Sequence, residues 1–416
     1  MFLLYQIIIS LLLLFSPIVI FYRVIKNKED TKRYKEKFSF TTSKRNKGNL
    51  IWFHGASVGE LMSVIPLIEK LEKKNNIKQI LVTTSTLSSA KIFNKFKFKK
   101  TVHQFFPLDT KYFSEKFLNY WQPNLVIFID SEIWPNMLYS LKKKKIYHIL
   151  LNARITKKTF NRWIRLGNFS KKLFQSFNCV YPQNTETLKY LNKLEVKKIK
   201  RIGNLKFSES ILDLKETVNQ NLKKFLNHKK YWCAASTHEG EELIAANTHI
   251  ALQKKISNLI TIIIPRNIQR TREILDTFSN LNLKFHHHSL NKKIPKNTQI
   301  YVVDTYGETK AFFKICKIVF LGKSLTTAGG QNPLEPARFN CNIIHGPKVS
   351  NFPEIYDFLD KNKISFKVNN ERQLIKKINE LFKKDIKSKD FGNKIKIMGQ
   401  KILNRTVIEI ENIIER

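Results

Sequence analysis

A carboxylate at the start of a predicted helix is the first feature of this chain that could do chemistry. Glu60 closes a turn of mostly small residues, Gly55–Glu60. The turn links a strand-like apolar run at Leu50–His54 to a helical pattern at Leu61–Leu71. Open α/β sheets bind ligands at the carboxyl ends of their strands, where small residues let a substrate approach the backbone. The alternative is that Glu60 only complements the helix dipole.

Two further carboxylates follow a second strand-like run. Asp130 and Glu132 lie in the segment 128–136, directly after an apolar stretch. Either could point toward the same site as Glu60, and the alternative for both is a capping role. Lys206 lies where the first predicted domain ends. Its charge could hold an anionic substrate or a leaving phosphate, and the alternative is one more solvated lysine.

The second half of the chain places polar side chains at several predicted strand ends. An arginine at such an end can bind a phosphate or carboxylate with two parallel hydrogen bonds. Serine and threonine can cap the next helix or contact a ligand. The residues concerned are Ser236, Thr237, Pro265, Arg266, Tyr306, Gly307 and Glu308.

The strongest signal is a glycine-rich segment that leads into a short helix. Gly329 and Gly330 precede Asn332, a predicted N-cap, and Pro333, which suits the first helical position. Such a start presents bare N–H groups to a phosphate, and Glu335 could accept two hydrogen bonds from ribose hydroxyls. The segment matches neither the Walker loop nor the dinucleotide GxGxxG pattern.

The charge of the chain predicts an anionic partner. Lys and Arg number 74 against 33 Asp and Glu, which gives a formal charge of +41. Phosphate, a lipid surface and nucleic acid all fit such a charge. Lysine is enriched throughout the chain, including at positions typical of plain surface, and this enrichment explains part of the excess.

Cysteine and histidine usage argues against a metal or redox site. The four cysteines, Cys179, Cys233, Cys316 and Cys341, lie far apart and form no CxxC pair. Buried thiols in a reducing compartment are expected. The run His286–His288 has no acidic or cysteine partner in its pattern, and we expect it mostly at the surface.

The amino terminus is predicted to be a membrane anchor. The uncharged run Phe2–Tyr22 is long enough to cross the hydrocarbon core. No basic residue precedes it and no small-residue cleavage site follows, so it does not look like a signal peptide. Basic residues cluster in 23–37, which predicts a cytoplasmic location for the rest of the chain and attraction to anionic lipids. Pro17 leaves a monotopic, partly inserted helix as the alternative.

The remaining chain alternates strand-like and helical runs twice. This pattern predicts an α/β fold with two Rossmann-like, doubly wound domains facing a cleft. One helix is expected over Phe160–Phe174 and a last short strand of the first domain over Lys198–Ile202. The expected division is a membrane anchor (1–22), a basic juxtamembrane segment (23–48), an N-terminal domain (49–207), a connector (208–228), a C-terminal domain (229–390) and a C-terminal helix (391–416).

Taken in order, these motifs resemble the transferases of 3-deoxy-D-manno-octulosonic acid (Kdo), which attach that sugar to lipid A precursors. The motifs are GASVGE, EIWPN, GNLKF, the Pro-Arg pair, the Tyr-Gly-Glu turn and GGQNPLEPA. The resemblance implies a GT-B fold, an acceptor domain followed by a nucleotide-sugar domain, CMP-Kdo as donor, and inversion at the anomeric carbon. It also implies an inner-membrane enzyme with its catalytic domains on the cytoplasmic side, no metal, no cofactor and no specific nucleic-acid partner.

The resemblance also implies roles for individual residues. Glu60 matches the general base, and Asp130 or Glu132 together with Lys206 matches groups that stabilise the transition state. The donor contacts correspond to Pro265, Arg266, Tyr306, Gly307, Glu308, Gly329, Gly330, Asn332, Pro333, Leu334 and Glu335.

The chain departs from the family pattern at a few positions of the donor pocket and at one carboxylate. Asn267 and Gln331 stand where histidine is common, Lys323 where a second glycine is usual, and Asp130 where glutamate is frequent. Two other functions stay open: a GT-B glycosyltransferase using another nucleotide sugar, and a membrane-tethered basic protein that binds nucleic acid. The second lacks support from any RNP, KH or zinc module, and its basic residues are dispersed.

Overall fold

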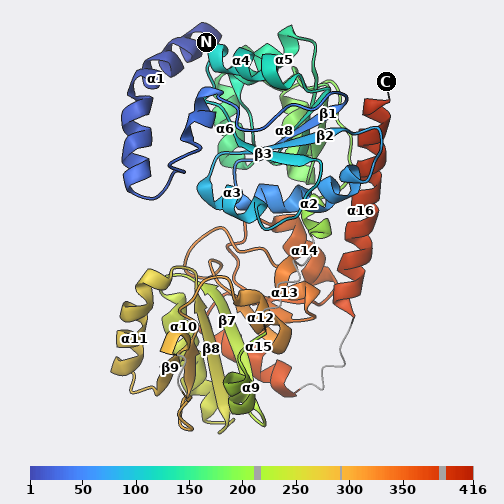
Figure 1. Cartoon of the computed structure of the whole chain (residues 1–416). Coiled ribbons are helices and arrows are strands. Elements are labelled where there is room, and N and C mark those ends of the chain that lie inside the picture. The colour runs from blue at the N-terminus through green and yellow to red at the C-terminus, as the bar shows by residue number, and fades with distance from the viewer. Residues whose placement is uncertain (210–216, 291–292, 384–389, 416) are drawn as a thin grey trace. The chain divides into compact units, whose positions relative to one another are not determined.

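The computed structural model describes residues 1–209, 217–290, 293–383 and 390–415 and divides into two compact units (Figure 1). Unit 1 comprises Met1–Ser210 together with Met398–Arg416, and unit 2 comprises Ile211–Ile397. Each unit contains one parallel sheet with helices packed on it. The predicted α/β class with two doubly wound domains is therefore confirmed for each unit taken by itself.

Unit 1 is built on a six-stranded parallel sheet of order β3-β2-β1-β4-β5-β6. Nearly every strand residue is buried, because helices cover both faces of the sheet. The strands are β1 Leu50–His54, β2 Gln79–Thr84, β3 Thr101–Phe105, β4 Leu125–Ile129, β5 Tyr147–Ala153 and β6 Cys179–Pro182. The helices before and between them are α1 Phe2–Ile25, η1 Tyr34–Phe38, α2 Val58–Glu72, α3 Leu87–Phe93, α4 Lys111–Trp121, α5 Pro135–Lys143, α6 Lys157–Arg165, α7 Asn168–Phe174, α8 Thr185–Lys193 and η2 Leu205–Ser208.

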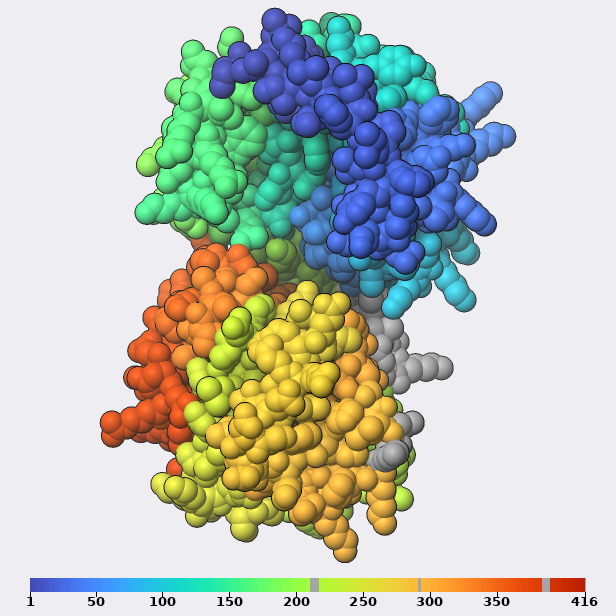
Figure 2. Space-filling view, turned by 90° about the vertical axis from the view of Figure 1, so that its left-hand side faces the viewer, coloured from blue at the N-terminus to red at the C-terminus, as the bar shows by residue number. Residues whose placement is uncertain are grey.

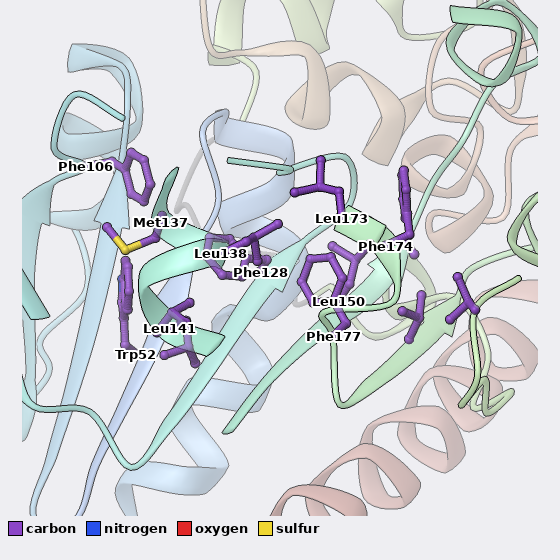
Figure 3. Close-up of a cluster of buried hydrophobic side chains, with 14 of the residues drawn as sticks. Trp52, Phe106, Phe128, Met137, Leu138, Leu141, Leu150, Leu173, Phe174 and Phe177 are labelled. Carbon is purple, nitrogen blue, oxygen red and sulfur yellow. The ribbon is translucent and has the colours of Figure 1, made fainter. Parts of the chain in front are cut away.

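Large side chains under the sheet hold the strand ends in place. Trp52 on β1 and Phe128 on β4 share one buried cluster with Met137 on α5 (Figure 3). The ring of Trp52 lies 4.8 Å from that of Phe117 on α4. Because β1 and β4 pair in register and carry helices packed through this cluster, the residues that follow the two strands start from fixed positions.

Unit 1 differs from the sequence prediction in three places. The helix expected over Phe160–Phe174 is two helices, α6 and α7, because Gly167 adopts a positive φ of 53° between them. The strand expected over Lys198–Ile202 is reduced to one bridge between Val180 and Ile199. Helix α8 was not predicted, although its capping residue, Asn184, accepts a hydrogen bond from the Thr187 amide at 2.8 Å.

Unit 2 is built on a seven-stranded parallel sheet of order β13-β12-β11-β7-β8-β10-β9. The strands are β7 Lys230–Thr237, β8 Leu259–Pro265, β9 Phe285–His287, β10 Ile300–Val302, β11 Ile318–Leu321, β12 Asn342–His345 and β13 Ser365–Lys367. The helices are α9 Gln220–Leu226, α10 Glu241–Gln253, η3 Ile268–Arg270, α11 Thr271–Asn280, η4 His288–Leu290, α12 Thr309–Ile315, α13 Leu334–Arg338, α14 Pro353–Lys361, α15 Glu371–Lys383 and α16 Phe391–Ile414.

The last part of α16 belongs to unit 1 and is held there by its acidic residues. Glu409 accepts a hydrogen bond from the Tyr181 hydroxyl at 2.9 Å and pairs with Lys200. Glu411 pairs with Lys74, just after α2, at 2.5 Å. The last part of α16 thus packs beside β6 and α2 of unit 1.

Each sheet has a point near its middle where the chain, after building strands on one side, continues on the other side. In unit 1 this point lies between β1 and β4, and in unit 2 between β7 and β11. Open parallel sheets bind ligands in the crevice outside the carboxyl ends of the strands at such a point. Functional residues are therefore expected there in both units.

Candidate active site

The four predicted catalytic residues of unit 1 gather at its switch point. Glu60 lies in the first turn of α2, after β1, while Asp130 and Glu132 follow β4 directly. Lys206 lies in η2, and its Nζ is 3.5 Å from Oδ2 of Asp130. Both acidic neighbours act electrostatically on Glu60. Three carboxylates and an ammonium group therefore form one cluster, the carboxylate cluster, at the switch point of unit 1.

One carboxylate oxygen of Glu60 caps the helix start, and the other has no hydrogen bond among the described residues. Its Oε2 accepts a hydrogen bond from the Ser57 amide at 3.1 Å, while the Ser57 hydroxyl accepts one from the Glu60 amide. Glu60 therefore does stabilise the helix start, as a capping box, but it uses one oxygen for this. Across the described residues, Oε1 of Glu60 accepts no protein hydrogen bond. Burial and the nearby Glu132 carboxylate raise the pKa of Glu60 above its ordinary value of 4.5, although the Ser57 amide opposes the shift. A raised pKa brings a carboxylate closer to the range useful for a general base.

Glu132 is held in one orientation by two rings. Its Oε2 accepts a hydrogen bond from Trp134 Nε1 at 2.7 Å and lies 3.0 Å from Nε2 of His54. The other ring nitrogen of His54 lies 2.9 Å from the Thr83 hydroxyl and 3.2 Å from the Thr83 carbonyl, and the ring stacks on Phe106. These contacts hold the ring so that Nε2 faces the Glu132 carboxylate.

Asp130 combines backbone strain with an unsatisfied oxygen. Its φ is 60°, in the left-handed region that few residues other than glycine adopt. The side chain is buried, and within the described part of the chain Oδ1 has no hydrogen-bond partner. Burial raises the pKa of Asp130, while the Lys206 ammonium opposes that shift. Strained backbone and an orphaned buried oxygen at a strand end are features that cluster at functional sites.

Neither Asp130 nor Glu132 caps α5, so the capping alternative for these two residues is wrong. The amides of Asn136 and Met137 donate instead to the carboxylate of Asp109, at 3.0 and 2.8 Å. Asp109 follows β3 and comes from a different loop. Sequence reasoning missed it, because nothing in the local pattern around Asp109 indicates a partner 27 residues away. His54 was also passed over, although it is the last strand residue before Gly55.

In unit 2 a buried glutamate organises the loop after β11. Glu241 accepts hydrogen bonds from four backbone amides: His238 at 3.0 Å, Lys323 at 2.7 Å, Ser324 at 3.0 Å and Leu325 at 3.0 Å. This residue spans the switch point between β7 and β11 and was not singled out from the sequence. Helix α10 begins at Glu241 with Gly240 as its N-cap, so the prediction that Ser236 or Thr237 caps that helix is wrong.

We expect Glu241→Ala to release this loop. Each buried amide left without an acceptor costs about 1–3 kcal/mol, and four amides lose theirs. Hydrogen exchange at Lys323, Ser324 and Leu325 should therefore become faster. The matched control is Glu239→Ala, which removes an exposed carboxylate two residues earlier. Unchanged exchange at the three amides would show that Glu241 does not hold the loop.

The glycine-rich segment adopts the backbone that its residues suggested, but the helix starts later than predicted. Gly329 and Gly330 have φ of 128° and 72°, values that favour glycine. Helix α13 has five residues with Pro333 as N-cap, so the predictions of Asn332 as N-cap and of Pro333 at the first helical position are wrong. Asn332 still accepts a hydrogen bond from the Leu334 amide at 3.1 Å. A helix this short has little dipole, so a phosphate here would depend on individual N–H groups.

The other predicted donor contacts are divided between exposed and buried positions. Arg266 and Tyr306 are exposed, and Glu335 is half-buried. Pro265 closes β8 opposite Thr237, and the Arg266 amide donates to the Thr237 carbonyl at 3.0 Å. The side chain of Leu334 is fully buried. A ligand at Leu334 would therefore contact only backbone.

The histidine run is more integrated than predicted. His286 is buried in β9, and His288 lies 2.7 Å from the Tyr301 hydroxyl and 2.9 Å from Oε2 of Glu308. The expectation of a mostly surface run is wrong for these two residues. Glu308 follows Gly307, whose φ is 97°. His288 thus orients one of the predicted donor contacts.

The described residues contain neither a reactive cysteine site nor a metal site. All four cysteines are free and buried, as expected. Burial raises the pKa of Cys179, Cys316 and Cys341, which keeps these thiols protonated and unreactive. Across 1–209, 217–290, 293–383 and 390–415, no group of three or more His, Cys, Asp or Glu side chains could hold a metal ion.

Comparison with known proteins gives consistent results for sequence and fold. A family model described as 3-deoxy-D-manno-octulosonic-acid transferase matches residues 32–209. The 3-deoxy-D-manno-octulosonic acid transferase of Rickettsia bellii is 33% identical over 89% of this chain and 88% of its own length. That of Haemophilus influenzae is 29% identical over 84% of each chain.

Solved structures agree on the fold at low identity. A glycosyltransferase from Rickettsia africae aligns with a TM-score of 0.60 at 11% identity, over 89% of this chain and all of that one. A UDP-GlcNAc 2-epimerase from Neisseria meningitidis aligns with a TM-score of 0.59 at 12% identity, over 88% of this chain and all of that one. These likenesses support two doubly wound α/β units of the GT-B kind.

Proposed function

This chain belongs to the family of 3-deoxy-D-manno-octulosonic acid (Kdo) transferases, and from that premise we propose that it transfers Kdo from CMP-Kdo to a lipid A precursor. The transfer inverts the anomeric carbon and takes place at the cytoplasmic side of the inner membrane, as a step of lipopolysaccharide synthesis. The single observation that carries the proposal is the carboxylate cluster at the ends of β1 and β4, where Glu60 has a raised pKa and, among the described residues, one oxygen without a protein hydrogen bond.

The reaction needs one proton transfer and one displacement. Glu60 takes the proton from a sugar hydroxyl of the acceptor, and that oxygen attacks the anomeric carbon of Kdo. The new C–O bond forms on the face opposite CMP, while the bond from that carbon to the CMP phosphate oxygen breaks. The proton stays on Glu60, and the electron pair leaves with CMP. A base placed in this way contributes about 10²–10⁴-fold to the rate.

The other residues of the carboxylate cluster orient the acceptor and balance the charge that develops on the leaving group. Glu132, fixed by His54 and Trp134, is placed to accept a hydrogen bond from the acceptor sugar. The Lys206 ammonium, beside Asp130, supplies positive charge where negative charge develops on the leaving phosphate. The pair is nearly buried, so these charges act with little screening by water.

The donor is assigned to unit 2 at the ends of β8, β10 and β11. Arg266 can form two parallel hydrogen bonds with the phosphate, and backbone N–H groups of 329–334 add to them. Glu308 and Glu335 can accept hydrogen bonds from ribose hydroxyls. Side chains of Tyr306 and Asn332, with the backbone of Pro265, Gly307, Pro333 and Leu334, complete the proposed contact set. That this site and the carboxylate cluster face one cleft stays a prediction.

Product analysis tests the proposal directly. Purified protein, CMP-Kdo and a tetraacylated lipid A precursor should give a product heavier by one or more Kdo units, and the mass would also fix their number. A parallel panel of UDP-sugars should give no product. Transfer from a UDP-sugar with none from CMP-Kdo would favour the alternative of another GT-B glycosyltransferase.

We expect Arg266→Ala to weaken donor binding more than any other exposed arginine. Hydrogen bonds to a charged group contribute about 1.5–3 kcal/mol, so the Kd for CMP should rise about 10–100-fold. Calorimetry with CMP measures the effect without the acceptor. Arg272→Ala, an exposed arginine on α11, is the matched control and should leave the Kd unchanged. If the two variants bind CMP with equal affinity, Arg266 does not contact the donor.

A further inference from the structure

Helix α1 presents an exposed apolar face along its whole length. Its better-covered residues recur every three or four positions and therefore lie on one side of the helix. They are Phe2, Tyr5, Gln6, Ile9, Leu13, Ser16, Ile20, Arg23 and Val24. The opposite side carries the exposed residues Leu3, Leu4, Ile7, Ile8, Leu11, Leu12, Leu14, Phe15, Ile18, Val19, Phe21, Tyr22 and Ile25. Figure 2 shows α1 in dark blue at the surface of unit 1, where nothing in that view lies over it.

The N-terminal end of α1 is attached to the body of unit 1. The Tyr5 hydroxyl donates to Oδ2 of Asp109 at 2.7 Å, and Gln6 Nε2 donates to Oδ1 of Asn136 at 3.0 Å. The ring of Phe2 lies 5.0 Å from that of Tyr139 on α5. Polar side chains that would be costly in hydrocarbon are thus bonded to the protein.

The segment after α1 is attached to the same unit. Arg33 donates to the His103 carbonyl on β3 at 2.8 Å, and Glu36 accepts from the Phe105 amide at 2.7 Å. Glu29 pairs with both Arg23, in the last turn of α1, and Lys37. The two ends of α1 are therefore both fixed to unit 1.

A helix held at both ends by one domain cannot cross a bilayer. The 24 residues of α1 extend about 36 Å, at 1.5 Å per residue, against a hydrocarbon core of about 30 Å. A spanning helix would place Tyr5 on the opposite side of the membrane from Asp109. The 2.7 Å hydrogen bond between them requires both on one side.

We propose that α1 is a monotopic anchor that lies along an anionic bilayer, with its exposed face in the hydrocarbon and both ends on one side. A continuous exposed apolar patch of this kind indicates an interaction surface. Lipid is the occupant that fits, because the patch carries no charge and exposed lysines follow it directly, at Lys26, Lys28, Lys32 and Lys35. The proposal does not depend on Kdo transfer.

Disulfide trapping in native membranes tests the contact at the N-terminal end. The pair Phe2→Cys and Tyr139→Cys should cross-link on mild oxidation, since the two side chains are neighbours. The matched control, Leu3→Cys with Tyr139→Cys, starts from an exposed residue on the opposite side of α1 and should cross-link at least tenfold less. Equal cross-linking of the two pairs would overturn the proposal.

Protease mapping with terminal tags tests the topology independently. In inverted membrane vesicles, tags at the N-terminus and at the C-terminus should both be digested, because both lie on the outer face of such vesicles. An N-terminal tag that is protected while the C-terminal tag is cut would show that α1 crosses the bilayer. Because neither readout uses enzyme activity, failure here leaves the proposed sugar transfer untouched.

Discussion

Replacing Glu60 with glutamine should reduce Kdo transfer by about 10²–10⁴-fold while CMP binding stays at the wild-type level. The amide keeps the size of the side chain and can still accept the hydrogen bond from the Ser57 amide, so the helix start is preserved. What it loses is the ability to take a proton from the acceptor. Transfer is measured from product mass, and CMP binding by calorimetry. Equal loss of binding and turnover would contradict a role as base.

The matched control is Glu69→Gln on the same helix. Glu69 is exposed and lies near the other end of α2, away from the carboxylate cluster, so transfer should not change. The stability of the variant also distinguishes a catalytic base from a purely structural glutamate. Because the folded state raises the pKa of Glu60, it disfavours the charged form at neutral pH relative to the unfolded chain. Glu60→Gln should therefore unfold at the same or a higher urea concentration, whereas a purely structural glutamate would give a less stable variant.

The pH profile of the wild-type enzyme follows from the same residue. A base must be deprotonated to act, so transfer should fall as pH decreases through the pKa of Glu60. Burial and Glu132 raise that pKa, so the acid limb should have its midpoint above 4.5. The limb should disappear from the residual activity of Glu60→Gln. An acid limb that survives in this variant would assign the titration to another group.

The sequence alone predicted residues whose surroundings are local and missed those whose partners are distant. Glu60, Asp130 and Glu132 follow strands directly, so strand-helix alternation was enough to place them at one edge of the sheet. Asp109 and Glu241 bind backbone amides 27 and more than 80 residues away. Long-range contacts of this kind depend on the strand order, which periodicity does not reveal.

The predicted start of helix α13 was wrong for a related reason. Asn332 has the side chain of an N-cap and does accept a hydrogen bond from a following amide, yet the helix begins after Pro333. Gly329 and Gly330 pass beside Asn351 and Val349, so tertiary packing decides how far the loop extends. The His288 contact with Glu308 likewise needs β9 and β10 side by side. Local patterns identified these residue types but not their neighbours.

Replacing Lys206 with methionine should be among the most destabilising single changes in unit 1. Asp130 would keep a buried charge after losing the ammonium 3.5 Å away. Breaking a buried ion pair from one side costs about 3–5 kcal/mol. Urea unfolding followed by tryptophan fluorescence reports mainly on this unit, because four of the five tryptophans lie in it, namely Trp52, Trp121, Trp134 and Trp163.

A double variant distinguishes the contribution of this ion pair to stability from its contribution to transfer. Asp130→Asn with Lys206→Met removes both charges, and asparagine tolerates the left-handed backbone at 130, so most of the stability should return. Transfer should stay lost, because the positive charge for the leaving phosphate is gone. Recovery of transfer along with stability would assign the pair to structure alone. The matched control is Lys200→Met, which breaks a solvent-accessible pair with Glu409 and should cost no more than about 1 kcal/mol.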